Sequence, residues 1–157
     1  MTYKPKSFRE KLADSHEFPK VVKINEKMSK RWGIGTVVIP SPKEVDAIMK
    51  KVPEGKLITI NQIREEVARR HGATIGCPIC CGIFARIAAG AADEEAKEGR
   101  KNITPYWRTL KKKGEINPKY PGGISRQRKL LENEGHKVIQ KGKKYFVADF
   151  EKYLVNT

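Results

Sequence analysis

The three cysteines of the chain fall within five positions, at Cys77, Cys80 and Cys81, and His71 comes shortly before them. A thiolate is a strong nucleophile and, together with histidine, a usual ligand of structural zinc. A tetrahedral zinc site usually takes two separated ligand pairs, and the sequence has no second pair. Buried thiols that pack one helix against another explain the spacing equally well, so we expect no metal. Cys80 or Cys81 as the acceptor of a transferred group stays an alternative, since a thiol near a helix start can be acidified.

A second stretch with the residues for chemistry is "NITPYWRTLKKKGEINPKYPGG", residues 102–123. Tyr106 and Trp107 are adjacent and precede Arg108, a lysine run follows, and the stretch closes in a glycine turn. Two arrangements fit this order. Either the aromatic side chains pack into a core beneath solvated lysines, or they form a base-sized pocket beside a phosphate-binding surface.

The charge of the chain favours a polyanionic partner. Lys and Arg number 33 against 18 Asp and Glu, a formal net charge of +15, and residues 101–147 hold 13 Lys and Arg against 3 Glu. Neutralising phosphates releases counterions, so such a concentration of positive charge predicts nucleic-acid binding, although net charge alone also keeps proteins soluble. No apolar run approaches the ~20 residues of a membrane span, and residues 1–20 lack the apolar core of a signal peptide. We therefore expect a cytoplasmic, nucleoid-associated protein with reduced thiols and no membrane contact.

The elements that would position these residues are mostly helices. Ser41 and Pro42 predict the start of a helix "PKEVDAIMKKV", and Thr59 opens a second helix that ends at Gly72. Pro78 begins a third helix, small and apolar at first and acidic later. Two helices joined by a tight link are typical of a helix-turn-helix.

The rest of the chain predicts short strands and one more helix. "YWRTLKKKGEIN" indicates two strands around Lys112, Lys113 and Gly114, a basic wing. "GISRQRKLLENEG" is an amphipathic helix, capped by Ser125 or by the preceding glycines, and "HKVIQKGKKYFVADF" is a hairpin with its turn at Gly142. "VVKI" and "GTVVIP" are candidate strands near the N-terminus, and the final "EKYLVNT" is a candidate short helix.

Together these patterns predict an α+β, mainly helical fold: a winged helix-turn-helix DNA-binding domain with short β-hairpins. We expect residues 41–157 to form this domain and residues 1–40 to be a basic N-terminal extension of uncertain order.

Five landmarks occur in the order and near the spacing of one known family: "VPEGKLITINQIREEVA", the Cys-Gly pair of "PICCGIF", "PYWR", "GEINPKYPGG" and "RQRKLLENEG". From Ser41 to about His136 the chain resembles the DNA-binding domain of the methylated-DNA–protein cysteine methyltransferases, the O6-alkylguanine-DNA alkyltransferases. The resemblance implies base flipping, with a cysteine that accepts the alkyl group from the flipped guanine.

The chain departs from that family at the reacting residue. The family motif reads Pro-Cys-His-Arg, and Tyr106 stands where the cysteine should be, with Trp107 in place of the histidine. Glu134 occupies the position of the family's glutamate. A phenol with an ordinary pKa near ~10 is a poor nucleophile toward carbon, so we expect no methyltransferase activity. The pattern resembles the alkyltransferase-like subgroup, which lacks the acceptor cysteine, binds alkylated DNA without repairing it and hands the lesion on.

The resemblance also implies the residues of the binding site. Aligning on Gly82 puts Ile79 where the family has the arginine that fills the gap left by the flipped nucleotide, and apolar wedges also unstack bases. The segment 86–101 is longer than its counterpart and acidic, and Ile60 replaces a phosphate-facing tyrosine. The predicted DNA- and base-binding residues are Tyr106, Trp107, Arg108, Tyr120, Gly122, Gly123, Ile79 and Gly82, and the predicted phosphate-binding residues are Lys111, Lys112, Lys113, Arg126 and Arg128.

The sequence thus predicts a monomeric protein without cofactor or metal that binds alkylated double-stranded DNA and signals to downstream repair proteins. Two alternatives stay open at this point. One is a general winged-helix DNA or RNA binder without lesion recognition, and the other is an alkyltransferase that uses Cys80 or Cys81.

Overall fold

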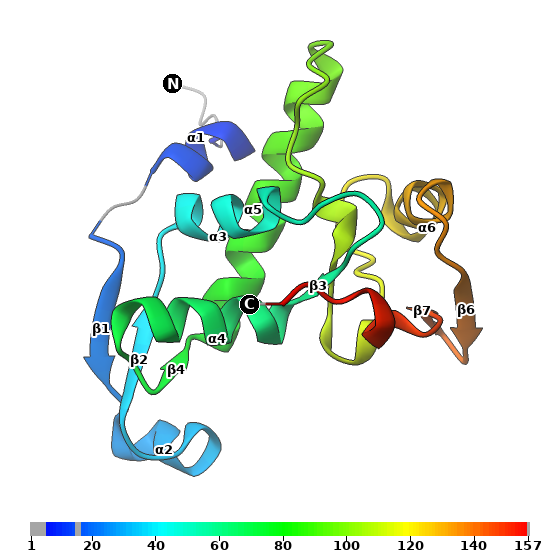
Figure 1. Cartoon of the computed structure of the whole chain (residues 1–157). Coiled ribbons are helices and arrows are strands. Elements are labelled where there is room, and N and C mark those ends of the chain that lie inside the picture. Colours follow the sequence, from blue (N-terminus) through cyan, green and yellow to red (C-terminus); the bar gives the residue numbers. More distant parts are fainter. Residues whose placement is uncertain (1–5, 15–16, 157) are drawn as a thin grey trace.

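The computed structural model describes residues 6–14 and 17–156. It confirms the predicted α+β class: helices dominate, and the described strands form one three-stranded sheet and two two-stranded sheets (Figure 1). The predicted winged helix-turn-helix is built from helices α3 to α6 and the C-terminal hairpin. No helix in the described part of the chain is long and apolar enough to cross a membrane.

The first two helices of this domain begin where their capping residues predict. Helix α3 spans Pro42–Lys50, and the Ser41 hydroxyl accepts a hydrogen bond from the Glu44 N–H at 3.2 Å. Helix α4 spans Ile60–His71 and starts with a capping box in which Thr59 and Gln62 satisfy each other's backbone N–H groups. It ends at Gly72, whose φ of 62° is the left-handed conformation that glycine adopts without strain.

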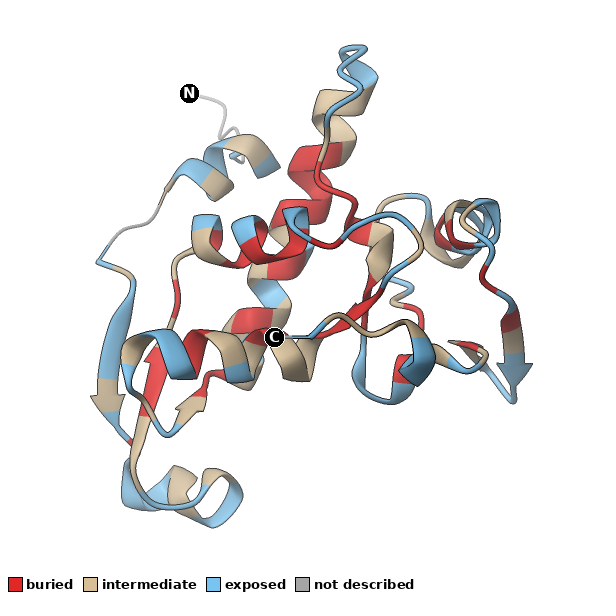
Figure 2. Ribbon diagram, in the orientation of Figure 1, coloured by how far each residue is buried: buried red, intermediate tan, exposed pale blue. Residues whose placement is uncertain are grey.

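Helix α5, Pro78–Lys97, is the central element of the main core. Its small buried residues allow close approach of α3 and α4, which contribute larger side chains such as Met49 and Ile63. In Figure 2 the buried segments of α3, α4 and α5 meet along the middle of α5. The small side chains of α5 therefore pack directly against the larger side chains of α3 and α4. The alanines that pack there are Ala85, Ala88, Ala89 and Ala92.

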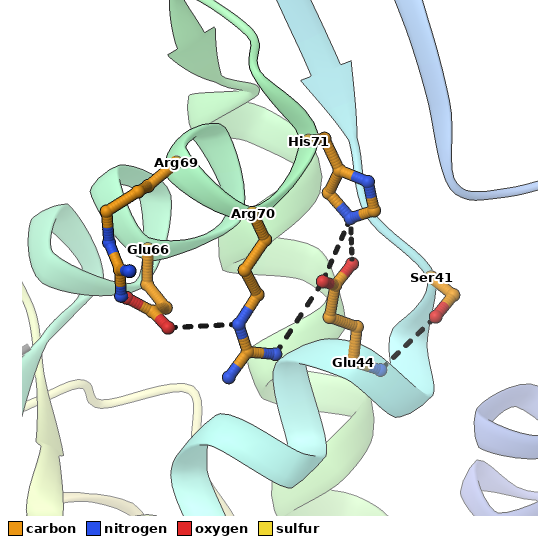
Figure 3. A network of polar contacts seen from close by, with 6 residues as sticks. All are labelled: Ser41, Glu44, Glu66, Arg69, Arg70 and His71. Carbon is orange, nitrogen blue, oxygen red and sulfur yellow. Dashed lines mark hydrogen bonds and ion pairs between the residues drawn. The ribbon is translucent and has the colours of Figure 1, made fainter.

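Polar contacts at the surface also tie α4 to α3 (Figure 3). The His71 Nε2 lies 2.9 Å from both carboxylate oxygens of Glu44, and the Arg70 Nη1 lies 3.7 Å from the same carboxylate. Glu66 accepts from Arg70 at 2.9 Å and also contacts Arg69. Burial raises the pKa of Glu66, but hydrogen bonds from the two arginines outweigh this and hold it below its usual value. The basic end of α4 is thus largely neutralised by carboxylates of the protein itself.

The N-terminal part adds a sheet, two of whose strands match the predicted strand patterns, and two short helices that were not predicted. Strands β1, Lys20–Lys23, and β2, Thr36–Ile39, pair antiparallel, and β2 pairs in parallel with β4, Ile75–Gly76. Helix α2, Glu26–Trp32, connects β1 to β2. The strands therefore join this region to the link between α4 and α5.

Helix α1, Phe8–Ala13, lies against the second half of α5. The Glu94 carboxylate accepts from the backbone N–H groups of Phe8 and Arg9, both at 3.0 Å, and Arg9 pairs with Glu98 at 2.6 Å. The Phe8 ring covers Gly90, where a Cβ atom would come within 2.3 Å of the ring. The acidic end of α5 thus anchors the N-terminal helix.

The predicted hairpin around Lys112 and Lys113 is wrong. The chain forms a 3-10 turn at Tyr106–Arg108, then β5, Thr109–Leu110, which pairs in parallel with β3, Ile58–Thr59. A second tight turn, Lys112–Gly114, closes with the Lys111 N–H donating to the Glu115 carbonyl at 2.8 Å. After this turn the chain pairs with β7 through Ile116 and Glu115 and does not return along β5. The two segments of the expected hairpin therefore pair with β3 and β7 and not with each other.

The remaining elements form a second, smaller core. Helix α6, Gly123–Asn133, is preceded by Gly122 with a φ of 80°, so the glycines and not Ser125 begin it. Strands β6, Val138–Lys141, and β7, Lys144–Val147, form the predicted hairpin with Gly142 at its turn. A 3-10 turn at Phe150–Tyr153 follows, where a short helix was expected. The buried members of this core are Leu57, Leu110, Ile116, Leu131, Val138 and Val147.

Candidate nucleic-acid interface

The second helix of the helix-turn-helix presents an uncovered stripe. Ile79 is 60% exposed and Ile83 47% exposed, and Arg86 is exposed one turn further along α5. The spacing of four and three residues places them on one face of the helix. A Cβ atom built on Gly82 would meet no atom within 4 Å, so the surface beside the two isoleucines is open. Exposed isoleucines on a helix with a nearby arginine suit insertion into a nucleic-acid groove.

The cysteines lie where α5 begins. The Cys77 Sγ accepts a hydrogen bond from the Cys80 N–H at 3.3 Å and so caps the helix. Hydrogen bonds to this sulfur, first from the Cys80 thiol and then from backbone N–H groups, lower the pKa of Cys77 to about 6 although burial opposes the shift. The hydrogen bond with Cys77 raises the pKa of Cys80, and burial raises the pKa of Cys81 to about 12. The two thiols considered as alkyl acceptors are therefore held protonated, and the acidified thiol of Cys77 is buried.

The side chain of His71 makes its polar contact away from the cysteines. The His71 ring contacts Glu44 on α3 (Figure 3). Within residues 6–14 and 17–156, no three His, Cys, Asp or Glu side chains are arranged to hold a metal ion.

Tyr106 is buried among aromatic rings. Its side chain is 1% exposed and meets Trp107 edge to face at a centroid distance of 5.4 Å and Tyr120 at 5.7 Å. Burial raises the pKa of Tyr106; the charge of Arg126 lowers it by a smaller amount, and the charge of Asp93 raises it. The hydroxyl has no hydrogen-bond partner among the described residues. Its place facing a flipped base stays a prediction, and in this structure the phenol remains protonated within the core.

Glu134 lies at the end of α6 and holds the two residues that follow Tyr106. Its carboxylate accepts from the Trp107 Nε1 at 2.8 Å, the Arg108 Nη2 at 2.7 Å and Nε at 2.9 Å, and the Gly55 N–H at 3.1 Å. Burial raises the pKa of Glu134, but the hydrogen bonds from Arg108 and Trp107 outweigh this and lower it. The Arg108 Nη1 also donates to the Val52 carbonyl at 2.7 Å. Each Arg108 nitrogen has an acceptor within the protein, so Arg108 connects the 3-10 turn to the end of α6 and to the loop after α3.

The predicted glycine turn borders a cavity. Tyr120 is buried, Gly122 has a left-handed backbone, and a Cβ atom at Gly122 would come within 2.4 Å of the Arg126 side chain. A cavity of about 310 Å³ lies between this turn and α5, within the range of small-molecule sites of about 300–1,000 Å³. Its wall on the N-terminal side is the Phe8 ring. The cavity is lined by Phe8, Arg86, Gly90, Asp93, Glu94, Lys97, Lys119 and Pro121.

The five predicted phosphate contacts are all exposed, but they are not equally free. The Arg126 Nη1 pairs with Asp93 at 2.8 Å and Arg128 with Glu132 at 3.5 Å, and Lys111 lies 4.0 Å from Glu115. In the described part of the chain, Lys112 and Lys113 have no ion-pair partner and are the least constrained cations of the turn.

The structure brings Arg86, Asp93 and Phe8 to the cavity, and none of them was predicted from sequence. Arg86 could have been found by extending the helical stripe of Ile79 and Ile83 by one turn. The acidic run that holds Asp93 was noted only as a departure from the family pattern. Nothing local in the sequence of α1 signals that Phe8 reaches Gly90, which lies more than eighty residues away.

His136 is buried near Glu134 and Arg108, and neither of its ring nitrogens is hydrogen-bonded to a described residue. Its ring meets Tyr153 edge to face at 4.8 Å. Burial lowers the pKa of His136, partly opposed by Glu134, while Arg108 lowers it further. The neutral ring is thus the form that the folded protein accommodates.

We expect the free energy of unfolding to fall as the pH drops below about 6.5, the ordinary pKa of histidine. Between that pH and the lower pKa in the folded state, the unfolded chain binds the additional proton, so acid favours unfolding. Urea unfolding measured from neutral to mildly acidic pH checks this. The variant His136→Phe keeps the contact with Tyr153 and should flatten this part of the profile, and an unchanged profile would contradict the assignment.

The exposed second helix, the basic turn and the β6–β7 hairpin define the architecture as a winged helix-turn-helix. Two solved structures share it: S. pombe Atl1 in complex with damaged DNA containing O6-carboxymethylguanine, with a TM-score of 0.51, and S. pombe ATL in complex with DNA, with a TM-score of 0.53. Each is 20% identical to this chain and the match covers 74% of this chain and 94% of the other. No protein-family model and no curated protein matched the chain. At this identity the likeness establishes the fold.

Proposed function

We propose that the protein is a non-catalytic DNA-binding protein that recognises alkylated DNA of the O6-alkylguanine type by base flipping and flags it for repair. The observation that carries the proposal is the cavity between α5 and the chain segment of Lys119 and Pro121, in a fold shared with a protein solved on DNA that contains O6-carboxymethylguanine. Proteins that flip a base need such a recess next to the element that enters the groove.

The groups at and next to the position of the family's acceptor cysteine support the proposed absence of alkyl transfer. Tyr106, at the position of the family's acceptor cysteine, is a buried phenol whose pKa is raised. Glu134 is engaged by Trp107 and Arg108, so it has no histidine to orient. Nucleophilic transfer requires an activated nucleophile with an adjacent base, and this site offers neither.

The binding residues then have separate tasks. Ile79 and Ile83 would enter the groove and separate the stacked bases, with Gly82 giving close access to the backbone. Lys112 and Lys113 would contact phosphates and fix the position of the duplex without reading sequence. Tyr106 and Tyr120 do not line the cavity in this structure, and the proposal is that they border the base once it has been flipped in.

A general DNA binder without lesion recognition is the second candidate. The burial of Tyr106 and Tyr120 favours it, because neither ring is exposed to a ligand in this structure. Both candidates predict salt-dependent DNA binding, and only the first predicts discrimination between damaged and intact duplexes.

The test is a binding comparison between duplexes with and without a single O6-methylguanine, over a range of salt concentrations. We expect tighter binding of the damaged duplex at every salt concentration, with both affinities falling as salt rises. Mass spectrometry of the protein after incubation with the damaged duplex should show no added methyl group. Equal affinities for the two duplexes would contradict lesion recognition, and a permanent mass increase would contradict the non-catalytic role.

A further inference from the structure

The excess of basic over acidic residues is concentrated in two separate segments of the chain, which we call the first and second block. Residues 1–40 hold 9 Lys and Arg against 4 Asp and Glu, and residues 101–147 hold 13 against 3. Residues 41–100, which include α3, α4 and α5, are nearly balanced, with 10 against 9. The second block contains the turn and α6 discussed above. The first block contributes Phe8 to the cavity, but none of its basic side chains lines that cavity among the described residues, so its charge needs a separate explanation.

Much of the N-terminal charge lies on one face of α2. Lys27, Lys30 and Arg31 are exposed, and Lys30 and Arg31 follow Lys27 by three and four residues, which places both next to Lys27 on the helix surface. None of the three has an ion-pair partner within residues 6–14 and 17–156, in contrast to Arg69 and Arg70 on α4, which contact Glu66. We call these three residues the α2 cationic face. Unpaired cations grouped in this way repel each other unless an anion binds.

The other side of α2 fixes its position beside the start of α5. Met28 and Trp32 pack against a small cluster of Ile24, Val37 and Cys77, and Cys80 of α5 packs against the same cluster. The Asn25 side chain caps α2 by accepting from the Met28 N–H at 2.8 Å, and β1 and β2 on either side pair along four residues. The α2 cationic face is therefore held next to the end of α5 that carries Ile79.

We propose that the α2 cationic face contacts the phosphate backbone of the duplex on the flank of the segment that α5 enters. The proposal rests on DNA binding by α5, as proposed above, and adds a second set of phosphate contacts on the side of the N-terminal sheet. These contacts read no base, so they lengthen the footprint on the duplex and leave lesion discrimination unchanged. The β1–α2–β2 unit is thereby part of the DNA-binding surface.

The test compares two triple variants with the same loss of charge. The first is Lys27→Gln, Lys30→Gln and Arg31→Gln, and the control is Lys43→Gln, Lys51→Gln and Lys56→Gln, all exposed positions on α3 and the loop after it. None of the six side chains has an ion pair within residues 6–14 and 17–156, so neither variant breaks a described interaction. Circular dichroism should show the same fold and melting for both.

Affinity for an undamaged duplex is measured over about 50–200 mM salt. Each lost phosphate contact reduces the slope of log affinity against log salt by about 0.9, so the first variant should lose about 2–3 units of slope and roughly tenfold or more in affinity. The control should keep a slope close to that of the parent, since net charge alone adds little at this ionic strength. Equal slopes for the two variants would overturn the proposal.

A second readout separates this proposal from the proposed function. The ratio of affinities for damaged and undamaged duplexes should be the same in the first variant and in the parent. If the parent shows no such preference while the first variant still loses slope, lesion recognition fails and the α2 contact stands. If the preference is present while the first variant keeps the parental slope, the α2 contact fails and lesion recognition stands.

Discussion

Replacing Glu134 with alanine is expected to lower the free energy of unfolding by about 3–5 kcal/mol, the usual cost of leaving one member of a buried ion pair without its partner. Arg108 would keep a largely buried guanidinium, of which only the Nη1 retains a partner, the Val52 carbonyl. Trp107 and Gly55 would also lose their acceptor. Urea unfolding at neutral pH measures the loss.

Glu132 provides the matched control on the same helix. Glu132→Ala removes an exposed carboxylate that lies 3.5 Å from Arg128, and such exposed pairs contribute about 0–1 kcal/mol. A double-mutant cycle that combines Glu134→Ala with Arg108→Ala should give a coupling energy of about 0.5–3 kcal/mol, as for residues in one hydrogen-bonded network. Similar, small losses for Glu134→Ala and Glu132→Ala would show that the Glu134 group does not stabilise the fold.

The contacts of Glu134 also bear on the proposed function, because the sequence resemblance aligns Glu134 with a glutamate that supports the reacting residues of that family. In that family the glutamate holds the histidine that deprotonates the cysteine. Here the carboxylate keeps its position, while a tryptophan N–H and an arginine satisfy it. The Glu134 carboxylate therefore connects α6 to the 3-10 turn, and none of its described partners is a base that could accept a proton.

Sequence patterns predicted helices α3, α4 and α5 well because their ends are determined locally, whereas α1 and α2 were not predicted. Ser41, Thr59 and Gly72 satisfy or terminate the helix backbone within three or four residues, so the signal and the structure occupy the same short window. The turn at Gly142 is equally local. These local signals located two consecutive helices joined by a short link, which is the pattern from which the helix-turn-helix was predicted.

Contacts between distant residues explain what the sequence could not predict. Strand β5 pairs with β3 some fifty residues earlier, and the following turn pairs with β7, so the lysine run does not form its own hairpin. The acidic run on α5 seemed to be an insertion, whereas Glu94 caps α1 and Asp93 pairs with Arg126. Neither partner can be read from the sequence around the run.

For the candidate site, the sequence likewise indicated the residues but not their surroundings, which depend on distant contacts. Residue types at 106–108 and 120–123 indicated a site, because an unusual composition is visible in one sequence. Their environment was not visible: the direction of Tyr106 into the core depends on Trp107, Tyr120 and the packing of α5. The cavity depends on Phe8, which only the docking of α1 brings there.

Replacing Tyr106 with phenylalanine is expected to raise the free energy of unfolding by about 1–3 kcal/mol, since it removes a buried hydroxyl that no described residue satisfies. The ring contacts with Trp107 and Tyr120 stay in place. A buried polar group that destabilises the free protein calls for an explanation, and a hydrogen bond to the bound base supplies one. On this argument the preference for O6-methylguanine DNA should fall roughly tenfold, the effect of one hydrogen bond of about 1.4 kcal/mol.

The variant Tyr106→Ala separates the hydroxyl from the ring. It should lower the free energy of unfolding by about 3–5 kcal/mol, as expected for deleting a large aromatic side chain from a core, and it should abolish the preference for damaged DNA at temperatures where the protein is folded. Binding is measured on both variants with the damaged and undamaged duplexes, and unfolding by urea. If Tyr106→Phe gains stability and keeps the full preference, the hydroxyl takes no part in recognition and the ring alone borders the base. If Tyr106→Ala also keeps the preference, the lesion is recognised elsewhere, because neither the edge nor the face of this ring is then required.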